Sequence, residues 1–423
     1  RKRIMPKATF EEQERVIDSV KKVVLLLLLY TTTLIATDDI TVSDNYISTL
    51  KQKQFNYDYE KNSEQSSLLE NSWIAPLNLS YSYSKTNPYG DVQINQMGAI
   101  TIDQPIFQSG GIYYGIKYAQ ATKKYSDYSV DVAKLKMIKD TIALLMQIKQ
   151  SEFRIERQKL QIENSEINLA QKKEQYLSGQ LDSGFLDTAI IERNFKTQAL
   201  YDMQTSKERL VSNFTTMSDL SYKELTIPHL ELLSKEQFLK YNISLKMAKA
   251  KLKRDNLNQD VTFAKYLPRV TLTGGYYWTK NENRTMKIGA SERDYYNYGF
   301  RVNMPININS FQDIEVSKIE FMKSALLKED RVLTLNSMFE QVMQNISNFE
   351  KKQILSLENI ELYSKLLKDT KKLFNAGYKT QYDVDTLQNS LKISELDSKI
   401  FEIDKQLELL TLYEIYVNDG SKR

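Results

Sequence analysis

The sequence predicts a mainly α-helical chain with a small transmembrane β part, arranged as two copies of a unit of helix, β-hairpin, long helix and helix. Three observations lead to this prediction. The stretches 116–178 and 306–376 contain neither glycine nor proline. Two shorter segments alternate between apolar and polar residues, which is typical of strands. The landmarks of the first half recur in the same order in the second half.

The composition excludes several classes of protein. Lysine and arginine number 58 against 54 aspartates and glutamates, so no excess of basic residues predicts a nucleic-acid partner. An apolar content of 41% with a mean hydropathy of −0.49 excludes a bundle of transmembrane helices. The absence of cysteine excludes disulfides and thiolate metal sites, and a single histidine leaves little for histidine-based catalysis. We therefore expect no enzyme activity and no cofactor.

Residues 1–36 are predicted to be an upstream segment followed by a signal peptide. Lys21 and Lys22 precede an apolar run and a small residue, Ala36, which is the pattern of an export signal. The apolar run is shorter than a typical transmembrane helix, so a permanent membrane anchor is the weaker alternative. Because the segment before this run is acidic, we expect translation to start just before Lys21 and cleavage to expose Thr37.

The two stretches without glycine or proline predict continuous helices over about 110–178 and about 310–376. The first helix carries two apolar rows of seven-residue period on nearly opposite sides, so it needs neighbours on both sides, as in a wall of helices. The second helix has one good row and a patchier opposite side. The rows of the first helix are Met146, Phe153, Leu160 and Ile167, and Ile148, Ile155, Ile162, Leu169 and Tyr176.

Segments of about 76–104 and about 269–304 predict β-hairpins. Alternation with one apolar and one polar face is the pattern of a strand between lipid and water. Trp73 and Trp278 lie beside or within these segments, where aromatic girdles are expected. Two solvated hairpins packed on a helical body are the alternative. The apolar positions include Leu77, Leu79, Tyr81 and Tyr83 in the first hairpin, and Val270, Leu272, Tyr276, Tyr298, Phe300 and Val302 in the second.

Matched landmarks in the two halves predict an internal duplication. The chain then divides into a first repeat over 37–218, a linker over 219–234, a second repeat over 235–417 and a tail over 418–423. The segment around Pro76 corresponds to that around Pro268, Pro105 corresponds to Pro305, and Gly179 corresponds to Gly377.

These prolines and glycines mark the predicted element ends. The prolines are expected at the junctions between helices and strands, because proline ends a helical ladder and is tolerated at a helix start. The glycines are expected to end the long helices, where a left-handed backbone is needed. Thr380 with Asp383, and Ser183 in the first half, are the predicted caps of the helices that follow.

The hairpins predict an assembly of several copies. One chain supplies four strands, whereas the smallest closed barrels in lipid have about eight, and every strand edge in lipid must be paired. Each copy must therefore contribute its hairpins to a shared barrel, which the helices would continue as a hollow tube. A tube joined to a membrane pore is a conduit.

The chain resembles the TolC-like outer-membrane efflux proteins over nearly all of residues 40–417. The resemblance rests on the duplicated layout and on three short motifs. These are Tyr266-Leu267-Pro268 before a strand, Gln104-Pro105-Ile106-Phe107 with Gly110-Gly111 before a helix, and Gly377-Tyr378-Lys379-Thr380-Gln381-Tyr382-Asp383-Val384 at a turn.

This resemblance implies a homotrimer in the outer membrane of a Gram-negative bacterium, with a shared 12-stranded β-barrel and a trimeric α-helical barrel across the periplasm. It implies a passive exit duct of a tripartite efflux or type I secretion system, which a periplasmic adaptor (membrane fusion) protein and an inner-membrane pump of RND or ABC type would feed. An envelope coiled-coil scaffold is the alternative, but it does not explain the hairpins. Drugs, metal ions and polypeptides all stay open as cargo.

The resemblance also implies site residues at the inner end of the duct. Asp383 stands where the first acidic residue of the closed aperture is expected, whereas Thr386 holds the second position and Asp385 is the nearby acid. Three copies of Asp383 around a narrow axis would attract cations; a helix cap is the alternative role, and the two can coexist. The turn residues that resemble the adaptor-docking tips are Ser178, Gly179, Gln180, Ala376, Gly377 and Tyr378.

Overall fold

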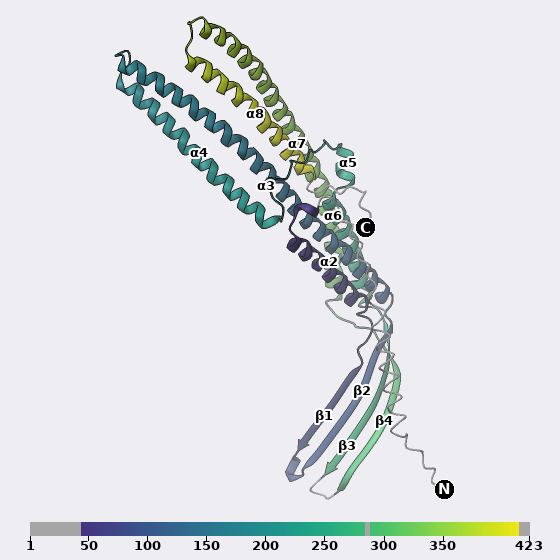
Figure 1. Cartoon of the computed structure of the whole chain (residues 1–423). Helices are drawn as coiled ribbons and strands as arrows, with labels where there is room; N and C mark the ends of the chain where they lie inside the picture. Colours follow the sequence, from purple (N-terminus) through teal and green to yellow (C-terminus); the bar gives the residue numbers. More distant parts are fainter. Residues whose placement is uncertain (1–43, 284–287, 414–423) are drawn as a thin grey trace. The chain divides into compact units, whose positions relative to one another are not determined.

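The computed structural model describes residues 44–283 and 288–413, so the signal expected over 1–36 and the tail expected over 418–423 lie outside the described residues. The first half comprises η2 (Asp44–Tyr46), α2 (Thr49–Glu70), β1 (Asn78–Thr86), η3 (Pro88–Gly90), β2 (Gln93–Phe107), α3 (Gly111–Leu177) and α4 (Ser183–Met217). The second half comprises α5 (Lys235–Lys240), α6 (Ile243–Ala264), β3 (Arg269–Asn283), β4 (Ile288–Asn303), α7 (Ser310–Asn375) and α8 (Gln381–Tyr413). Both halves contain, in order, a helix, two strands, a long helix and a further helix (Figure 1).

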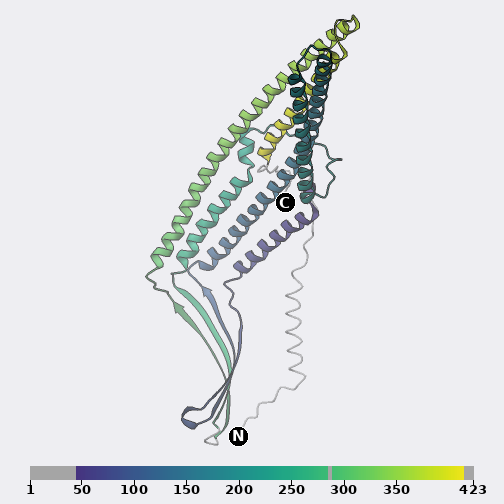
Figure 2. The same ribbon diagram turned by 90° about the vertical axis from the view of Figure 1, so that its left-hand side faces the viewer.

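The helices lie side by side, and each long helix alternates with a pair of shorter ones. α3 contacts α2, α4, α6 and α8, and α7 contacts α6 and α8. The order across the helices is therefore α2/α4, α3, α6/α8 and α7 (Figure 2). No helix within the described residues carries an apolar stretch long enough to cross a bilayer.

The two apolar rows of α3 enter different clusters of buried side chains. Ile148 lies in a cluster with Phe214 of α4, and both side chains are fully buried. Met146 lies in another cluster with Ile403 and Leu410 of α8. A helix with neighbours on two sides needs two such rows, so the wall-like packing expected for α3 is confirmed.

The shorter helices of each pair meet end to end beside the middle of the long helices. The amide of Ser48 donates to the carbonyl of Met217 at 2.7 Å, and the amide and hydroxyl of Thr49 donate to Asp219 at 2.8 and 3.0 Å. α2 therefore begins where α4 ends. On the other side of α3, the start of α6 packs against the end of α8 through Ile243, Leu245, Leu409 and Leu412.

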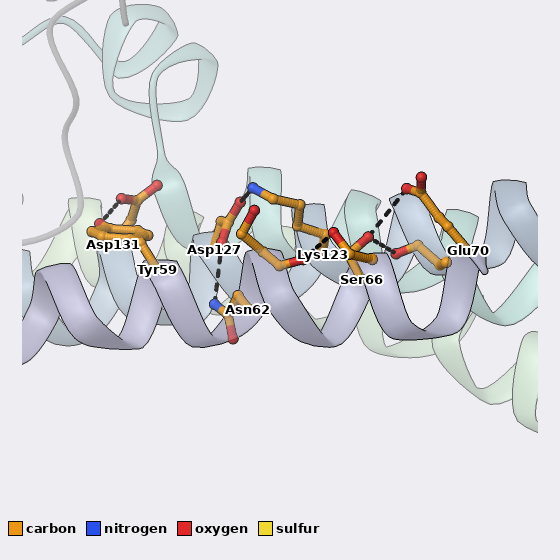
Figure 3. A network of polar contacts seen from close by, with 10 residues as sticks. Tyr59, Asn62, Ser66, Glu70, Lys123, Asp127 and Asp131 are labelled. Atoms are coloured by element: carbon orange, nitrogen blue, oxygen red, sulfur yellow. Dashed lines mark hydrogen bonds and ion pairs between the residues drawn. The ribbon is translucent and has the colours of Figure 1, made fainter. Parts of the chain in front are cut away.

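Polar side chains attach α2 to α3 (Figure 3). The hydroxyl of Tyr59 donates to Asp131 at 2.5 Å, and the side-chain amide of Asn62 donates to Asp127 at 3.1 Å. Asp127 also pairs with Lys123 at 2.8 Å, and Ser66 donates to Glu70 and to the carbonyl of Ala119, each at 3.3 Å. α2 also exposes the large apolar side chains of Leu50, Tyr57 and Leu68.

A buried carboxylate joins α6 to α7. Asp255 is only 5% exposed, pairs with Lys251 at 2.8 Å and Arg254 at 2.6 Å, and accepts a hydrogen bond from Ser324 of α7. Burial acts to raise the pKa of Asp255, but the hydrogen bonds from Lys251, Ser324 and Arg254 outweigh it and lower the pKa. The carboxylate therefore stays ionised at neutral pH and binds the two helices together.

The four strands form one antiparallel sheet in the order β1-β2-β3-β4, so the two hairpins pair with each other through β2 and β3. The register places Leu79, Ile100, Tyr276 and Tyr296 in one row across all four strands. Side chains alternate between faces along a strand, so this row defines an apolar face. Its members include Leu79, Tyr81, Tyr83, Ile100, Ile102, Val270, Leu272, Tyr276, Trp278, Tyr296, Tyr298, Phe300 and Val302.

The opposite face, here called the polar face, carries mainly Ser, Thr, Asn and Arg side chains. The apolar face is uncovered, since Leu79 is 81% and Tyr298 82% exposed. β1 and β4 are the edge strands, and each has one side without a strand partner among the described residues. The sheet thus has the one-sided apolar character that the sequence predicted.

Candidate aperture, turn tips and sheet junctions

Asp383 lies in the first turn of α8, where it completes a capping box. Its carboxylate accepts hydrogen bonds from the amide and the hydroxyl of Thr380, both at 2.9 Å, and its own amide donates to the Thr380 hydroxyl at 3.3 Å. The predicted Thr380–Asp383 cap is confirmed. The hydrogen bonds from Thr380, with the nearby charge of Lys379, lower the pKa of Asp383, so its charge persists to acidic pH.

The other two predicted aperture residues have local partners. Asp385 accepts a hydrogen bond from the side-chain amide of Gln381 at 2.7 Å. The hydroxyl of Thr386 donates to the carbonyl of Tyr382 at 2.8 Å, one turn back in the same helix. Asp383 and Asp385 therefore place two carboxylates in the first turns of α8, where the positive end of the helix favours them.

Sequence reasoning missed a contact that joins the two halves beside this site. The hydroxyl of Tyr382 donates to Glu174 of α3 at 2.9 Å, and this bond raises the pKa of Tyr382. The two residues are 208 positions apart, so no local spacing could have paired them. The bond links the end of α3 to the start of α8.

The prediction that Ser183 caps α4 is wrong. Asp182 is the cap, and its carboxylate accepts from the amide of Gly184 at 3.0 Å, while Ser183 is the first residue of the helix. The carboxylate also accepts from the Ser183 hydroxyl at 3.2 Å, and the hydrogen bonds from Gly184 and Ser183 lower the pKa of Asp182. Aspartate and serine are similarly good caps, so residue type alone did not distinguish the two adjacent candidates.

Both long helices end in the same turn geometry. Gly179 and Gly377 have φ angles of 73° and 77°, in the left-handed region that glycine adopts without steric cost. After each glycine the next amide bonds back to the helix, from Gln180 to Gln175 and from Tyr378 to Leu373, both at 2.9 Å. These bonds form a Schellman motif.

The two tips expose apolar side chains. Leu177 of α3, Phe185 of α4 and Tyr378 of the α7–α8 turn are all more than half exposed, and Tyr378 is 81% exposed. Of the other predicted tip residues, Ser178 and Ala376 close the ends of α3 and α7. An exposed apolar tip next to charged residues is typical of a docking surface.

The prolines at the sheet junctions occupy different kinds of position. Pro76 and Pro268 lie one or two residues before β1 and β3, as expected from the break in the helical ladder. Pro105, expected at a strand exit, lies inside β2, where it pairs with Thr271 at a register shift next to Phe107. The irregularity accommodates a residue without an N–H group, so the strand continues beyond residue 104. Pro305 follows β4 and precedes α7 by five residues, so it is not in a helical first turn.

Side chains bind the base of the sheet to the helices. The side chain of Gln104 accepts from the amide of Ala75 at 2.9 Å and donates to the carbonyl of Trp73 at 3.1 Å. Asp313 of α7 accepts from the hydroxyl of Tyr266 at 2.6 Å and pairs with Lys265 at 2.9 Å. The bonds from Tyr266 and Lys265 lower the pKa of Asp313.

The described residues show no cluster for catalysis by a metal. Across 44–283 and 288–413, no group of three or more His, Asp or Glu side chains is arranged to hold a metal ion. His229, the single histidine, is exposed, with Nδ1 at 3.3 Å from the side-chain amide of Gln406.

Residues 235–415 match the model of a protein family described as outer membrane efflux protein. The predicted resemblance is confirmed. The matched range covers α5 to α8 and both strands of the second hairpin. No curated protein matches the chain.

Solved structures of outer membrane channels have the same fold. The CmeC channel of Campylobacter jejuni is similar at a TM-score of 0.70 with 14% identity, over 90% of this chain and 86% of CmeC. VceC of Vibrio cholerae is similar at 0.68 with 12% identity, over 88% of this chain and 94% of VceC. The open state of the MtrE channel of Neisseria gonorrhoeae is similar at 0.63 with 13% identity, over 88% of this chain and 86% of MtrE. At these identities the likeness concerns the fold.

Proposed function

We propose that the protein is an outer-membrane exit duct, which passively conducts cargo from a pump and an adaptor across the periplasm and the outer membrane. One observation carries the proposal. The four strands form a continuous sheet with one apolar face and two open edges, and each open edge is connected to an outer helix of the wall.

The connection between edges follows from chain order. β1 follows α2, which lies at one end of the order of helices, and β4 leads into α7, which lies at the other end. When β4 of one copy pairs with β1 of the next, α7 therefore meets the neighbour's α2 and α4. The alternation of one long helix with a pair of shorter helices then continues around a ring.

The outer face of α7 suits such a contact. Phe311, Ile319, Met322, Leu326 and Leu333 lie within one stripe at helical spacing, and all are exposed in the single chain. α4 exposes Phe185, Ile191 and Phe195 at the opposite end of the order of helices. Exposed apolar stripes of this length are typical of interfaces.

A homotrimer would place twelve strands in one closed barrel, with the apolar face toward lipid and the polar face toward the lumen. The lumen would continue through the helices to the turn tips. Exposed Leu177, Phe185 and Tyr378 would there contact a periplasmic adaptor, and Asp383 and Asp385 would face the aperture. Energy would come from an inner-membrane pump.

Electron microscopy of the detergent-extracted protein tests this proposal. A ring of three copies with a central channel, and stepwise conductance in planar bilayers, are the expected results. A solid rod or a monomer that stays in solution without detergent would instead support an envelope scaffold.

A further inference from the structure

Charged side chains on the polar face of the sheet are mostly basic. The register places the even-numbered residues of β1 and the odd-numbered residues of β2, β3 and β4 on this face, up to the shifts at the strand ends. Among the described side chains, three arginines and one aspartate lie there, which leaves a net charge of +2 per chain. They are Arg269, Arg293, Arg301 and Asp103, and all four are exposed.

Two of the arginines are close neighbours without a carboxylate between them. Arg269 pairs with Asn303, and Arg301 pairs with Thr271, so the two arginines are diagonal neighbours on the same face. Such positions lie about 7–8 Å apart, within reach of long side chains. Two positive charges repel each other, so the pair itself adds no attractive charge interaction to the sheet.

No acidic side chain of the sheet neutralises the pair. Asp103 pairs with Thr273, two residues along the sheet from Thr271, and makes no ion pair with either arginine. Glu292 and Asp294 lie on the apolar face, where they accept hydrogen bonds from Trp278 and Tyr276. Asp313, just beyond the base of the sheet, is engaged by Lys265 and Tyr266.

A neighbouring copy would not neutralise the pair either. The strand that would meet β4 in a ring is β1, whose polar face carries only uncharged residues. These residues are Asn78, Ser80, Ser82, Ser84 and Thr86. The basic character of the face would therefore persist in the assembly.

We propose that Arg269 and Arg301 form an anion-binding station in the barrel part of the lumen, which binds phosphate groups or other groups with multiple negative charges. This inference rests on the proposed function, because it takes the polar face as the lumen wall. Guanidinium groups bind phosphate and carboxylate groups with paired hydrogen bonds. A narrow, water-filled channel whose wall carries charges of one sign also concentrates ions of the opposite sign.

Planar-bilayer recordings of the full-length assembly test the station, with inorganic tripolyphosphate as the probe on the side of the strand loops. We expect tripolyphosphate to block the wild-type current. The double variant Arg269→Gln/Arg301→Gln should need about tenfold more tripolyphosphate for the same block, because two charge-assisted hydrogen-bonding groups are lost. Its reversal potential in a KCl gradient should shift toward cations.

Two variants separate position from net charge. Lys280→Gln removes a positive charge from the apolar face, where Lys280 pairs with Glu292, and should leave the block unchanged. Arg269→Lys/Arg301→Lys keeps both charges and should retain most of the block.

If the double glutamine variant does not assemble, the recordings of the wild type, of Lys280→Gln and of the double lysine variant still test the station. A conducting wild type that tripolyphosphate does not block, or an equal effect of Lys280→Gln, would overturn the station, whereas a wild type without conductance would overturn the proposed duct itself.

Discussion

The hydroxyl of Tyr382 and the carboxylate of Glu174 are joined by a hydrogen bond of 2.9 Å, which fastens the start of α8 to the end of α3. The bond lies beside both turn tips and beside the capping box of Asp383. It connects the two halves of the chain at the end where the proposed aperture opens.

Replacement of Tyr382 by phenylalanine should loosen the aperture. The change removes the hydroxyl alone, so we expect a weaker contact between α8 and α3 and a higher single-channel conductance. Tyr378→Phe is the matched control, because Tyr378 is exposed at the neighbouring tip. Equal conductance of Tyr382→Phe and the wild type would show that this bond does not hold the aperture.

Two substitutions of Asp383 should separate its charge from its role as a cap. Asp383→Gln keeps a side-chain acceptor at the third position of the helix but removes the charge, whereas Asp383→Ala removes both. Both should raise conductance and reduce the preference for cations, and only Asp383→Ala should lower the free energy of unfolding, by about 0.5–2 kcal/mol. Unchanged selectivity in Asp383→Gln would leave the cap as the sole role of this residue.

The pH dependence of the cap follows from the lowered pKa of Asp383. A carboxylate whose pKa is lower in the folded state stabilises that state fully above its unfolded pKa, and the stabilisation is lost as the pH falls through the folded pKa. The unperturbed value is 3.8, so we expect conductance and stability to hold from neutral pH to about pH 4 and to change below it. The thermal midpoint of the wild type should fall as the pH drops below about pH 4. The midpoint of Asp383→Gln should fall less over the same range, because this variant lacks the carboxylate at position 383.

Loss of the buried charge at Asp255 should weaken the packing of α6 on α7. Asp255→Asn removes the ion pairs with Lys251 and Arg254, and we expect the free energy of unfolding to fall by about 1–3 kcal/mol. Asp260→Asn, on the same helix, should change it by less than about 0.5 kcal/mol. Denaturant titration, monitored by the circular dichroism of the helices, measures the free energy of unfolding of both variants. Equal changes would show that the Asp255 cluster does not stabilise the packing of α6 on α7.

An acidic residue on the outer stripe of α7 should prevent assembly without unfolding the chain. Leu326 is 67% exposed in the single chain, so Leu326→Asp costs little there but buries a charge in the proposed interface. We expect native mass spectrometry in detergent to show monomers for Leu326→Asp and trimers for Leu326→Met. Intact trimers of Leu326→Asp would place the interface elsewhere.

Periodic spacing predicted the parts of this fold that repeat along the chain. The rows through Met146 and Ile148 indicated that α3 packs on two sides, and alternation through Leu79 and Tyr81 indicated an apolar strand face. Both follow from local geometry, since seven- and two-residue periods fix which side chains share a face.

Periodic spacing could not predict the contacts between segments that are far apart in the sequence. Tyr382 and Glu174 belong to helices whose mutual rotation depends on the packing of the whole layer, and the pairing of β2 with β3 depends on how the hairpins meet. The cap at Asp182 is local, but the spacing left two adjacent residues of similar propensity to choose between. Pro105 lies inside β2 because a register shift accommodates it, and that shift depends on the pairing with β3.

Among the described residues, α3 and α7 run without interruption past the level at which α2 meets α4 and α6 meets α8. These two helices therefore connect the turn tips to the strands directly, whereas each pair of shorter helices has a break at that level. A proline placed at Leu145, in the middle of α3, would break one of the two continuous helices and weaken the mechanical connection between the tips and the base of the sheet.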